Sequence, residues 1–112
     1  MAIRGSFSSG TGLLSVFGEE LDNAIIVSRD AAGTILINGG AVSVEGGRPT
    51  VANTGTIQVL GQGGNDRIVL DEVNGALPSA RLFGSTGADT LIGGSASDQL
   101  LRGQRYSHWQ RR

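Results

Sequence analysis

Aliphatic side chains along this chain occur in short runs separated by glycine, serine, asparagine and aspartate. Within the runs the apolar positions are continuous or two residues apart, and they lack the 3.6-residue spacing of an amphipathic helix. Glycine also recurs too often for a stable helix. The pattern therefore predicts short strands joined by tight turns, with strands over residues 13–17, 24–27, 58–60, 67–69 and 81–83.

The loops between these runs repeat one nine-residue phrase, over residues 61–69, 84–92 and 93–101. A glycine opens each copy, an aspartate follows five positions later, and an aliphatic residue comes two positions after the aspartate. The glycine and aspartate pairs are Gly61 with Asp66, Gly84 with Asp89, and Gly93 with Asp98. A degenerate copy starts at Gly18 and carries Asn23 at the aspartate position. This spacing predicts a tight loop that enters a very short strand.

The strands on either side of these loops align as well. With Gly18, Gly61 and Gly84 superimposed, residues 15–17, 58–60 and 81–83 fall on one another before the loop, and the strands from Ala24, Arg67 and Thr90 do so after it. Self-similarity of this kind is typical of solenoids, in which each coil buries its aliphatic face on the next. The predicted fold class is all-β, a parallel β-helix or β-roll solenoid.

The remaining segments complete the predicted organisation. Residues 34–37 and 41–44 flank Asn38-Gly39-Gly40, which predicts a β-hairpin inserted into the repeat. Residues 71–79 form a return bend, in which the adjacent carboxylates Asp71 and Glu72 are interpreted as solvent-facing charges. We expect residues 1–12 to be a flexible leader, 13–101 to be a single domain, and 102–112 to be a basic, disordered tail.

The nine-residue phrase resembles the calcium-binding nonapeptide repeat of RTX (haemolysin-type) proteins, Gly-Gly-x-Gly-x-Asp-x-U-x with U aliphatic. Gln62 and Ser85 depart from the second glycine of this pattern, and Ala96 departs from the inner glycine. In the family, one coil holds two nonapeptides, and calcium lies between loops stacked on the same side. The resemblance implies a calcium-binding module that is secreted or displayed on a bacterial cell surface.

The residue types in the phrase suit calcium on physical grounds. Glycine allows a loop to turn its carbonyl oxygens inward, and aspartate adds a carboxylate. Because calcium takes about six to eight oxygen ligands, two loops must stack to complete one site. Asp and Asn also cap turns without any metal, so a metal-free turn is the alternative interpretation of each copy.

The family coil allows the spacings to be interpreted. Asp89 lies 23 positions after Asp66, which is one coil plus a five-residue insertion, so these loops are expected on the same side. Asp98 lies nine positions after Asp89, half a coil, and is expected on the opposite side. The predicted metal ligands are Gly61, Gly63, Gly64, Asp66, Gly84, Thr86, Gly87 and Asp89, with Asp98 as a further candidate.

Composition narrows the function classes. The 112 residues carry a formal net charge of −1, no lysine and no cysteine, which excludes a disulfide framework and gives no global attraction to nucleic acid. No apolar run reaches the roughly 18 residues of a membrane span. The single histidine, His108, lies in the basic tail, so we expect no enzyme activity. This tail does not resemble the C-terminal export segment common in RTX proteins.

The predicted function is therefore a structural repeat module whose folding is driven by Ca²⁺, with an open edge that lets copies associate into a homo-oligomer. One alternative is a calcium-independent β-solenoid that serves assembly or adhesion. A second alternative is a fragment of a polysaccharide-acting β-helix, for which Arg67 and Arg81 beside the loops are the residues to test.

Overall fold

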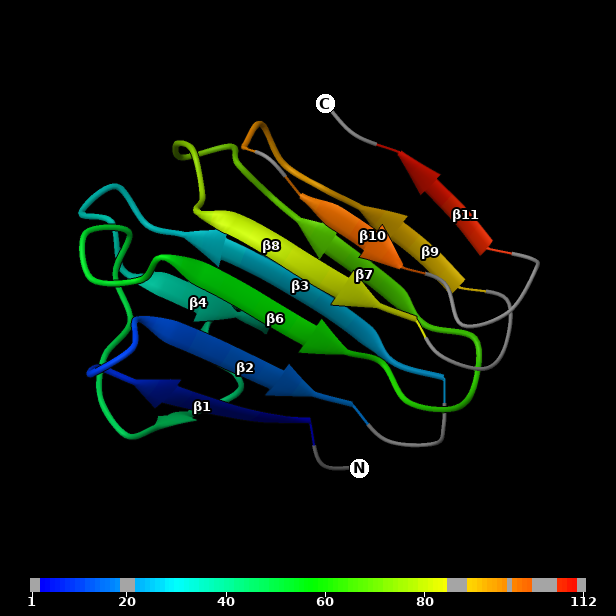
Figure 1. Cartoon of the computed structure of the whole chain (residues 1–112), viewed down its shortest axis with the longest axis horizontal. Helices are drawn as coiled ribbons and strands as arrows, with labels where there is room; N and C mark the ends of the chain where they lie inside the picture. Colours follow the sequence, from blue (N-terminus) through cyan, green and yellow to red (C-terminus); the bar gives the residue numbers. More distant parts are fainter. Residues whose placement is uncertain (1–2, 19–21, 85–88, 97, 102–106, 111–112) are drawn as a thin grey trace.

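The computed structural model describes residues 3–18, 22–84, 89–96, 98–101 and 107–110, which form two facing β-sheets (Figure 1). The regular elements are β1 (Arg4–Ser8), β2 (Leu13–Phe17), β3 (Ala24–Arg29), β4 (Ile35–Ile37), a 3₁₀ turn η1 (Asn38–Gly40), β5 (Val44–Glu45), β6 (Thr56–Leu60), β7 (Arg67–Leu70), β8 (Ser79–Phe83), β9 (Asp89–Ile92), β10 (Gln99–Leu101) and β11 (Ser107–Gln110).

The chain crosses between the two sheets at most of its loops. The first sheet has the strand order β10-β8-β6-β2-β1-β5, and the second has the order β11-β9-β7-β3-β4. Strands β2, β6, β8 and β10 run parallel to one another, as do β3, β7, β9 and β11. Each strand of the first parallel set is followed in the chain by a strand of the second (Figure 1).

Alternation along the strands explains why the sheets face each other. In β2, β6 and β8 every second side chain is buried and its neighbours are partly or fully exposed. The inward side chains of both sheets form one aliphatic core, to which Val16, Val59 and Leu82 contribute from the first sheet and Ile25 and Ile68 from the second. Alternating burial of this kind is the two-residue period of a half-buried strand.

The register confirms the alignment made from the loops. Phe17 pairs with Leu60, and Leu60 pairs with Phe83, so the strands before the glycines lie side by side. After the loops, Ala24 pairs with Arg67, which in turn pairs with Thr90.

The prediction of a parallel β-helix or β-roll solenoid is wrong. Both sheets are mixed, because β1 pairs antiparallel with β2 and β4 pairs antiparallel with β3, and the described strands form no closed solenoid. These reversed strands come from segments that carry no copy of the repeat, so they cannot stack as further coils. They pair instead with the outer edges of β2 and β3, whose backbone groups need partners.

The predicted inserted hairpin is also wrong. Its two halves separate, because β4 joins the second sheet and β5 joins the first, and only a single bridge between Ile37 and Val42 links them. Asn38 at the turn has a φ of 52°. Its side-chain amide bonds the backbone of β3, in the way that the backbone of a neighbouring strand would. Its Oδ1 accepts the Ile26 N–H at 2.8 Å and its Nδ2 donates to the Ala24 carbonyl at 3.2 Å. This amide satisfies backbone groups at the edge of β3.

Both terminal segments contribute strands. The predicted flexible leader contains β1, which pairs along its whole length with β2 and buries Phe7 in the core. The predicted tail is described only at Ser107–Gln110, which forms β11 beside β9. No helix within the described ranges is long and apolar enough to cross a membrane.

The shared core makes a direct prediction. Leu82 is fully buried between the sheets, whereas Val73 is 79 % exposed. Leu82→Ala should lower the free energy of unfolding by about 2 to 5 kcal/mol because it leaves a cavity. Val73→Ala should change it by less than about 0.5 kcal/mol. Denaturant melts of the two variants test this, and equal effects would contradict the assigned core.

Candidate functional site

The three loops that open at Gly18, Gly61 and Gly84 start next to one another at one end of the parallel strands. Each begins with a glycine immediately after a strand of the first sheet, and this glycine bonds to the neighbouring strand. Gly18 N–H donates to the Leu60 carbonyl at 2.7 Å, and Gly61 N–H donates to the Phe83 carbonyl at 2.8 Å. Gly84 continues the series. The opening glycines therefore follow one another in the same order as the strands that precede them.

The aspartates of these loops form a ladder. Asp89 Oδ1 accepts the backbone N–H of Asp66 at 2.7 Å, and Asp66 Oδ1 accepts the backbone N–H of Asn23 at 2.8 Å. The side chains point into the protein, with Asp66 only 2 % and Asp89 only 1 % exposed. The expectation that the loops around Asp66 and Asp89 lie on the same side agrees with this contact.

The side chain of each ladder residue lies so close to the opening residue of its loop that only a glycine fits there, five residues earlier. A Cβ added at Gly61 would lie 2.5 Å from Asp66 Oδ2, and one added at Gly18 would lie 2.6 Å from Asn23 Oδ1. A Cβ at Gly84 would likewise collide with Asp89 Oδ2. Among the loop positions that the structure describes, a positive φ occurs at Gly64 (86°) and at Gln62 (70°), so the opening glycines are needed for space rather than for their backbone angles.

The second oxygen of each of these two carboxylates is buried and accepts no hydrogen bond from the described residues. Asp66 Oδ2 and Asp89 Oδ2 have no hydrogen-bond partner among the described residues. Burial raises the pKa of Asp66 to about 7, and the neighbouring Asp89 charge adds to the rise, whereas the Asn23 N–H opposes it. Burial also raises the pKa of Asp89. An uncompensated buried carboxylate binds a proton or a cation more readily than a solvated one does.

These two carboxylates are the acidic part of the candidate site. Of the other predicted ligands, Gly61, Gly63, Gly64 and Gly84 belong to the same pair of loops, and Thr86 and Gly87 lie outside the described residues. In the part of the chain that the structure describes, no three His, Cys, Asp or Glu side chains lie together as a metal-binding group. A cation here would therefore depend on backbone carbonyl oxygens for most of its ligands.

Asp98 lies at the other end of the strands, as its half-coil spacing predicts. Its Oδ1 accepts the Ala80 N–H at 2.9 Å, and its Oδ2 accepts the Gly94 N–H at 2.8 Å. Both carboxylate oxygens are thus used by the backbone. Asp98 joins the third loop to the bend before β8 and does not share a site with Asp66 and Asp89.

Glu72 is the residue that the sequence interpretation missed. Its Oε1 accepts the Ser95 N–H at 3.0 Å and its Oε2 accepts the Leu77 N–H at 2.9 Å, so it clamps the third loop to the bend instead of facing solvent. A Cβ at Gly94 would lie 2.5 Å from Glu72 Oε2. Glu72 precedes Ser95 by 23 residues, the offset that separates Asp66 from Asp89, and this shared offset is the pattern that could have revealed it.

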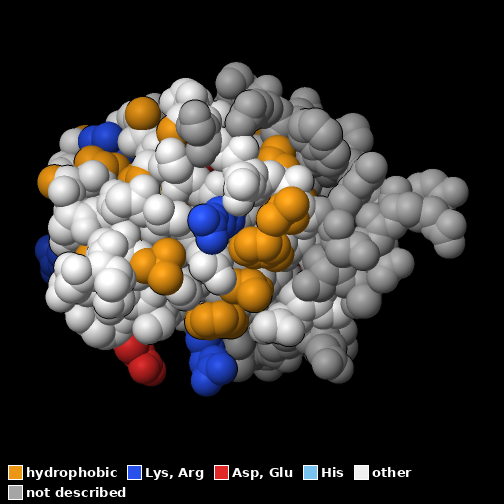
Figure 2. Space-filling view, viewed as in Figure 1, with side chains coloured by type: hydrophobic (Ala, Val, Ile, Leu, Met, Phe, Trp, Pro, Cys, Tyr) orange, Lys and Arg blue, Asp and Glu red, His pale blue; other side chains and the backbone are white. Residues whose placement is uncertain are grey.

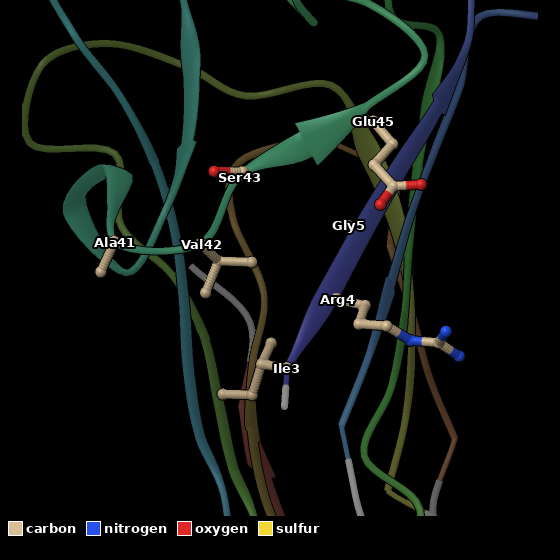
Figure 3. A pocket seen from close by; sticks show the side chains of 7 residues that line it. All are labelled: Ile3, Arg4, Gly5, Ala41, Val42, Ser43 and Glu45. Atoms are coloured by element: carbon tan, nitrogen blue, oxygen red, sulfur yellow. The ribbon is translucent and has the colours of Figure 1, made fainter. Parts of the chain in front are cut away.

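Other candidate features lie away from these loops. Arg67 on β7 and Arg81 on β8 are exposed on different sheets, so they do not form one site. A hollow of about 410 Å³ lies beside β1 and β5, where Ile3 and Val42 supply apolar side chains and Glu45 stands at the side (Figure 3). None of the predicted ligands lines this hollow.

No protein-family model, curated protein or solved structure matches this chain. The likeness to RTX proteins is therefore carried by the loop residues alone.

Substitution of a loop glycine tests the close approach. Gly84→Ala should lower the free energy of unfolding by about 1 to 3 kcal/mol, because the new methyl group occupies the space of Asp89 Oδ2. Gly55→Ala is the matched control, since nothing lies within 4 Å of its added Cβ. Denaturant melts compare the two variants, and equal stabilities would contradict the geometry.

The raised pKa of Asp66 predicts the pH dependence of stability without metal. The folded protein holds a proton on Asp66 up to about pH 7, whereas the unfolded chain releases it near 3.8, so this group stabilises the fold less as pH rises through that interval. In chelator, the thermal midpoint should therefore decrease as the pH is raised from 4 to about 7. Asp66→Asn should flatten the profile, and an unchanged slope in this variant would assign the dependence elsewhere.

Proposed function

We propose that this chain is a calcium-binding structural module in which the ion is held by the Asp66 and Asp89 loops. One observation carries the proposal: two adjacent, buried carboxylates each keep an oxygen without a partner among the described residues. The resemblance of both loops to the RTX nonapeptide supports calcium as the ion.

The chemistry of the loops supports a hard cation. The available donors are oxygens, which calcium prefers, and the chain has no cysteine that would favour a softer metal. Asp66 and Asp89 would neutralise the ion, and carbonyl oxygens of Gly61, Gly63, Gly64 and Gly84 would supply further ligands. Bound calcium would offset the negative charge that burial makes unfavourable at these carboxylates.

Ion binding would also stabilise the fold. A cation that binds the stacked loops and not the unfolded chain stabilises the protein by about 2.7 kcal/mol at a hundredfold excess over its Kd. The chain's own residues set up this coupling, because the two carboxylates come together only when β7 and β9 pair. The RTX resemblance further supports a location outside a bacterial cell.

A calcium-independent assembly module is the second candidate. It is favoured by the backbone N–H groups of Asn23 and Asp66, which already bond one oxygen of each carboxylate without an ion. In this case a proton on the second oxygen would replace the cation. The two candidates differ in what neutralises the loops near pH 7.

A calcium titration distinguishes them. At about pH 7.5, the thermal midpoint of the wild-type protein should rise as calcium is added and fall in chelator. Magnesium should give a smaller shift, because it demands a tighter octahedral shell. Asp66→Asn and Asp89→Asn should lose the calcium response. In chelator both variants should melt no lower than the wild type, because each keeps the oxygen acceptor and removes a buried charge.

The exposed Glu45 provides the control. Glu45→Gln changes the charge equally and should keep the full calcium response. A midpoint that is insensitive to calcium in the wild type would refute the proposal. Concentration-dependent light scattering that persists in chelator would then support the assembly module.

A further inference from the structure

The outer face of the first sheet carries side chains in ordered rows. The last residues of four parallel strands form an apolar row in direct register, which we call the outer stripe; its members are Phe17, Leu60, Phe83 and Leu101. Leu101 is 44 % exposed and the other three are partly exposed. Figure 2 shows a band of apolar side chains crossing the face formed by these strands.

A polar row runs beside the outer stripe, two residues earlier on each strand. It consists of Ser15, Gln58, Arg81 and Gln99, again in register. Neighbouring strands are about 4.8 Å apart, so hydroxyl, amide and guanidinium groups repeat at that interval next to an apolar surface. An open hollow of about 320 Å³ lies along this row, lined by Thr56, Ser79, Ala80, Arg81 and Gln99.

Arg81 gives this face its charge. It is exposed, and it makes no ion pair with any described residue. The strands β2, β6, β8 and β10 contain no acidic residue at all. In Figure 2 a basic side chain (blue) adjoins the apolar band. The carboxylate next to Arg81 in the sheet, Asp98, is buried, and its oxygens accept the Ala80 and Gly94 N–H groups, so the Arg81 guanidinium remains exposed to an outside ligand.

We infer that this face binds an acidic polysaccharide, with sugar rings packed on the outer stripe and a carboxylate paired with Arg81. A saccharide ring has an apolar face that packs on Phe83 and hydroxyl groups that bond the polar row. Its carboxylate complements the unpaired guanidinium, which forms paired bonds with carboxylates. A polymer presents these groups repeatedly, as the rows do.

Two other occupants fit the face less well. A second copy docked through the same four strands would bring no carboxylate to Arg81, because those strands contain none and the exposed Glu45 lies on β5, two strands beyond β2 at the far edge of the sheet. A peptide that adds to a sheet does so along a free strand edge, whereas the rows lie on the flat face between β2 and β10. This inference does not depend on calcium, since none of the row residues belongs to the predicted ligands.

Calorimetric titration with short uronic-acid oligosaccharides tests the inference, and a neutral glucan oligosaccharide of equal length serves as the reference ligand. The full chain is used in calcium-free buffer, under conditions in which circular dichroism shows it folded. We expect the uronate to bind and the neutral glucan to bind about tenfold more weakly, the change expected when a charge-assisted contact of about 1.4 kcal/mol is absent.

Variants assign the binding to the face. Arg81→Gln should weaken uronate binding about tenfold and remove the preference for uronate over glucan, because glutamine keeps hydrogen-bonding groups for hydroxyls but loses the positive charge. Phe83→Ser should weaken both ligands. Arg48→Gln removes the same charge from an exposed turn outside the rows and should leave both affinities intact. The inference is overturned if Arg48→Gln and Arg81→Gln have equal effects, or if neither ligand binds. If no ligand binds, and light scattering shows a wild-type dimer that Phe83→Ser dissociates, the face is a contact between copies and the inference is likewise overturned.

Discussion

The carboxylate-to-backbone ladder of Asn23, Asp66 and Asp89 is the constraint on which the arrangement of the loops depends. Each rung joins one loop to the next through a buried hydrogen bond of 2.7 or 2.8 Å. The bond requires the side chain to turn inward, and the inward turn requires a residue without Cβ at Gly18, Gly61 or Gly84. A buried N–H that lost its acceptor would be costly, so the ladder fixes the loop order together with the strand register.

The same ladder leaves the loops incompletely satisfied. A carboxylate has two oxygens and about four acceptor positions, and a single backbone N–H uses only one of them. At Asp98 both oxygens find backbone donors, whereas Asp66 and Asp89 keep one buried oxygen without a described partner. The two ends of the strands thus differ chemically. At the bend beside Asp98, backbone N–H groups bond both carboxylate oxygens. At the opposite end, a proton or a cation would be needed to neutralise the buried oxygens of Asp66 and Asp89.

The strand pairing and the loop positions that the sequence predicted correctly follow from the repeated nine-residue phrase. The paired strands around Gly61 and Gly84, and the neighbouring positions of Asp66 and Asp89, follow from a pattern that recurs along the chain. The antiparallel strands β1 and β4 were not predictable in this way, because their pairing is set by exposed edges of β2 and β3 rather than by their own residues. Glu72 was missed because it is a glutamate outside any phrase, and its role depends on loop residues that are distant in sequence.

The two faces of the parallel strands link the loops to the outer stripe. In β8, Leu82 enters the core while Arg81 and Phe83 face outward, and Gly84 opens the loop directly after Phe83. Because side chains alternate along β6 and β8, the register that brings Asp66 to Asp89 is the same register that lines up Leu60 with Phe83. A shift of one residue would turn the stripe inward and break the ladder. A proton or cation that neutralises the buried carboxylates would stabilise this shared register, while the contacts to a ligand on the outer rows would come from other residues.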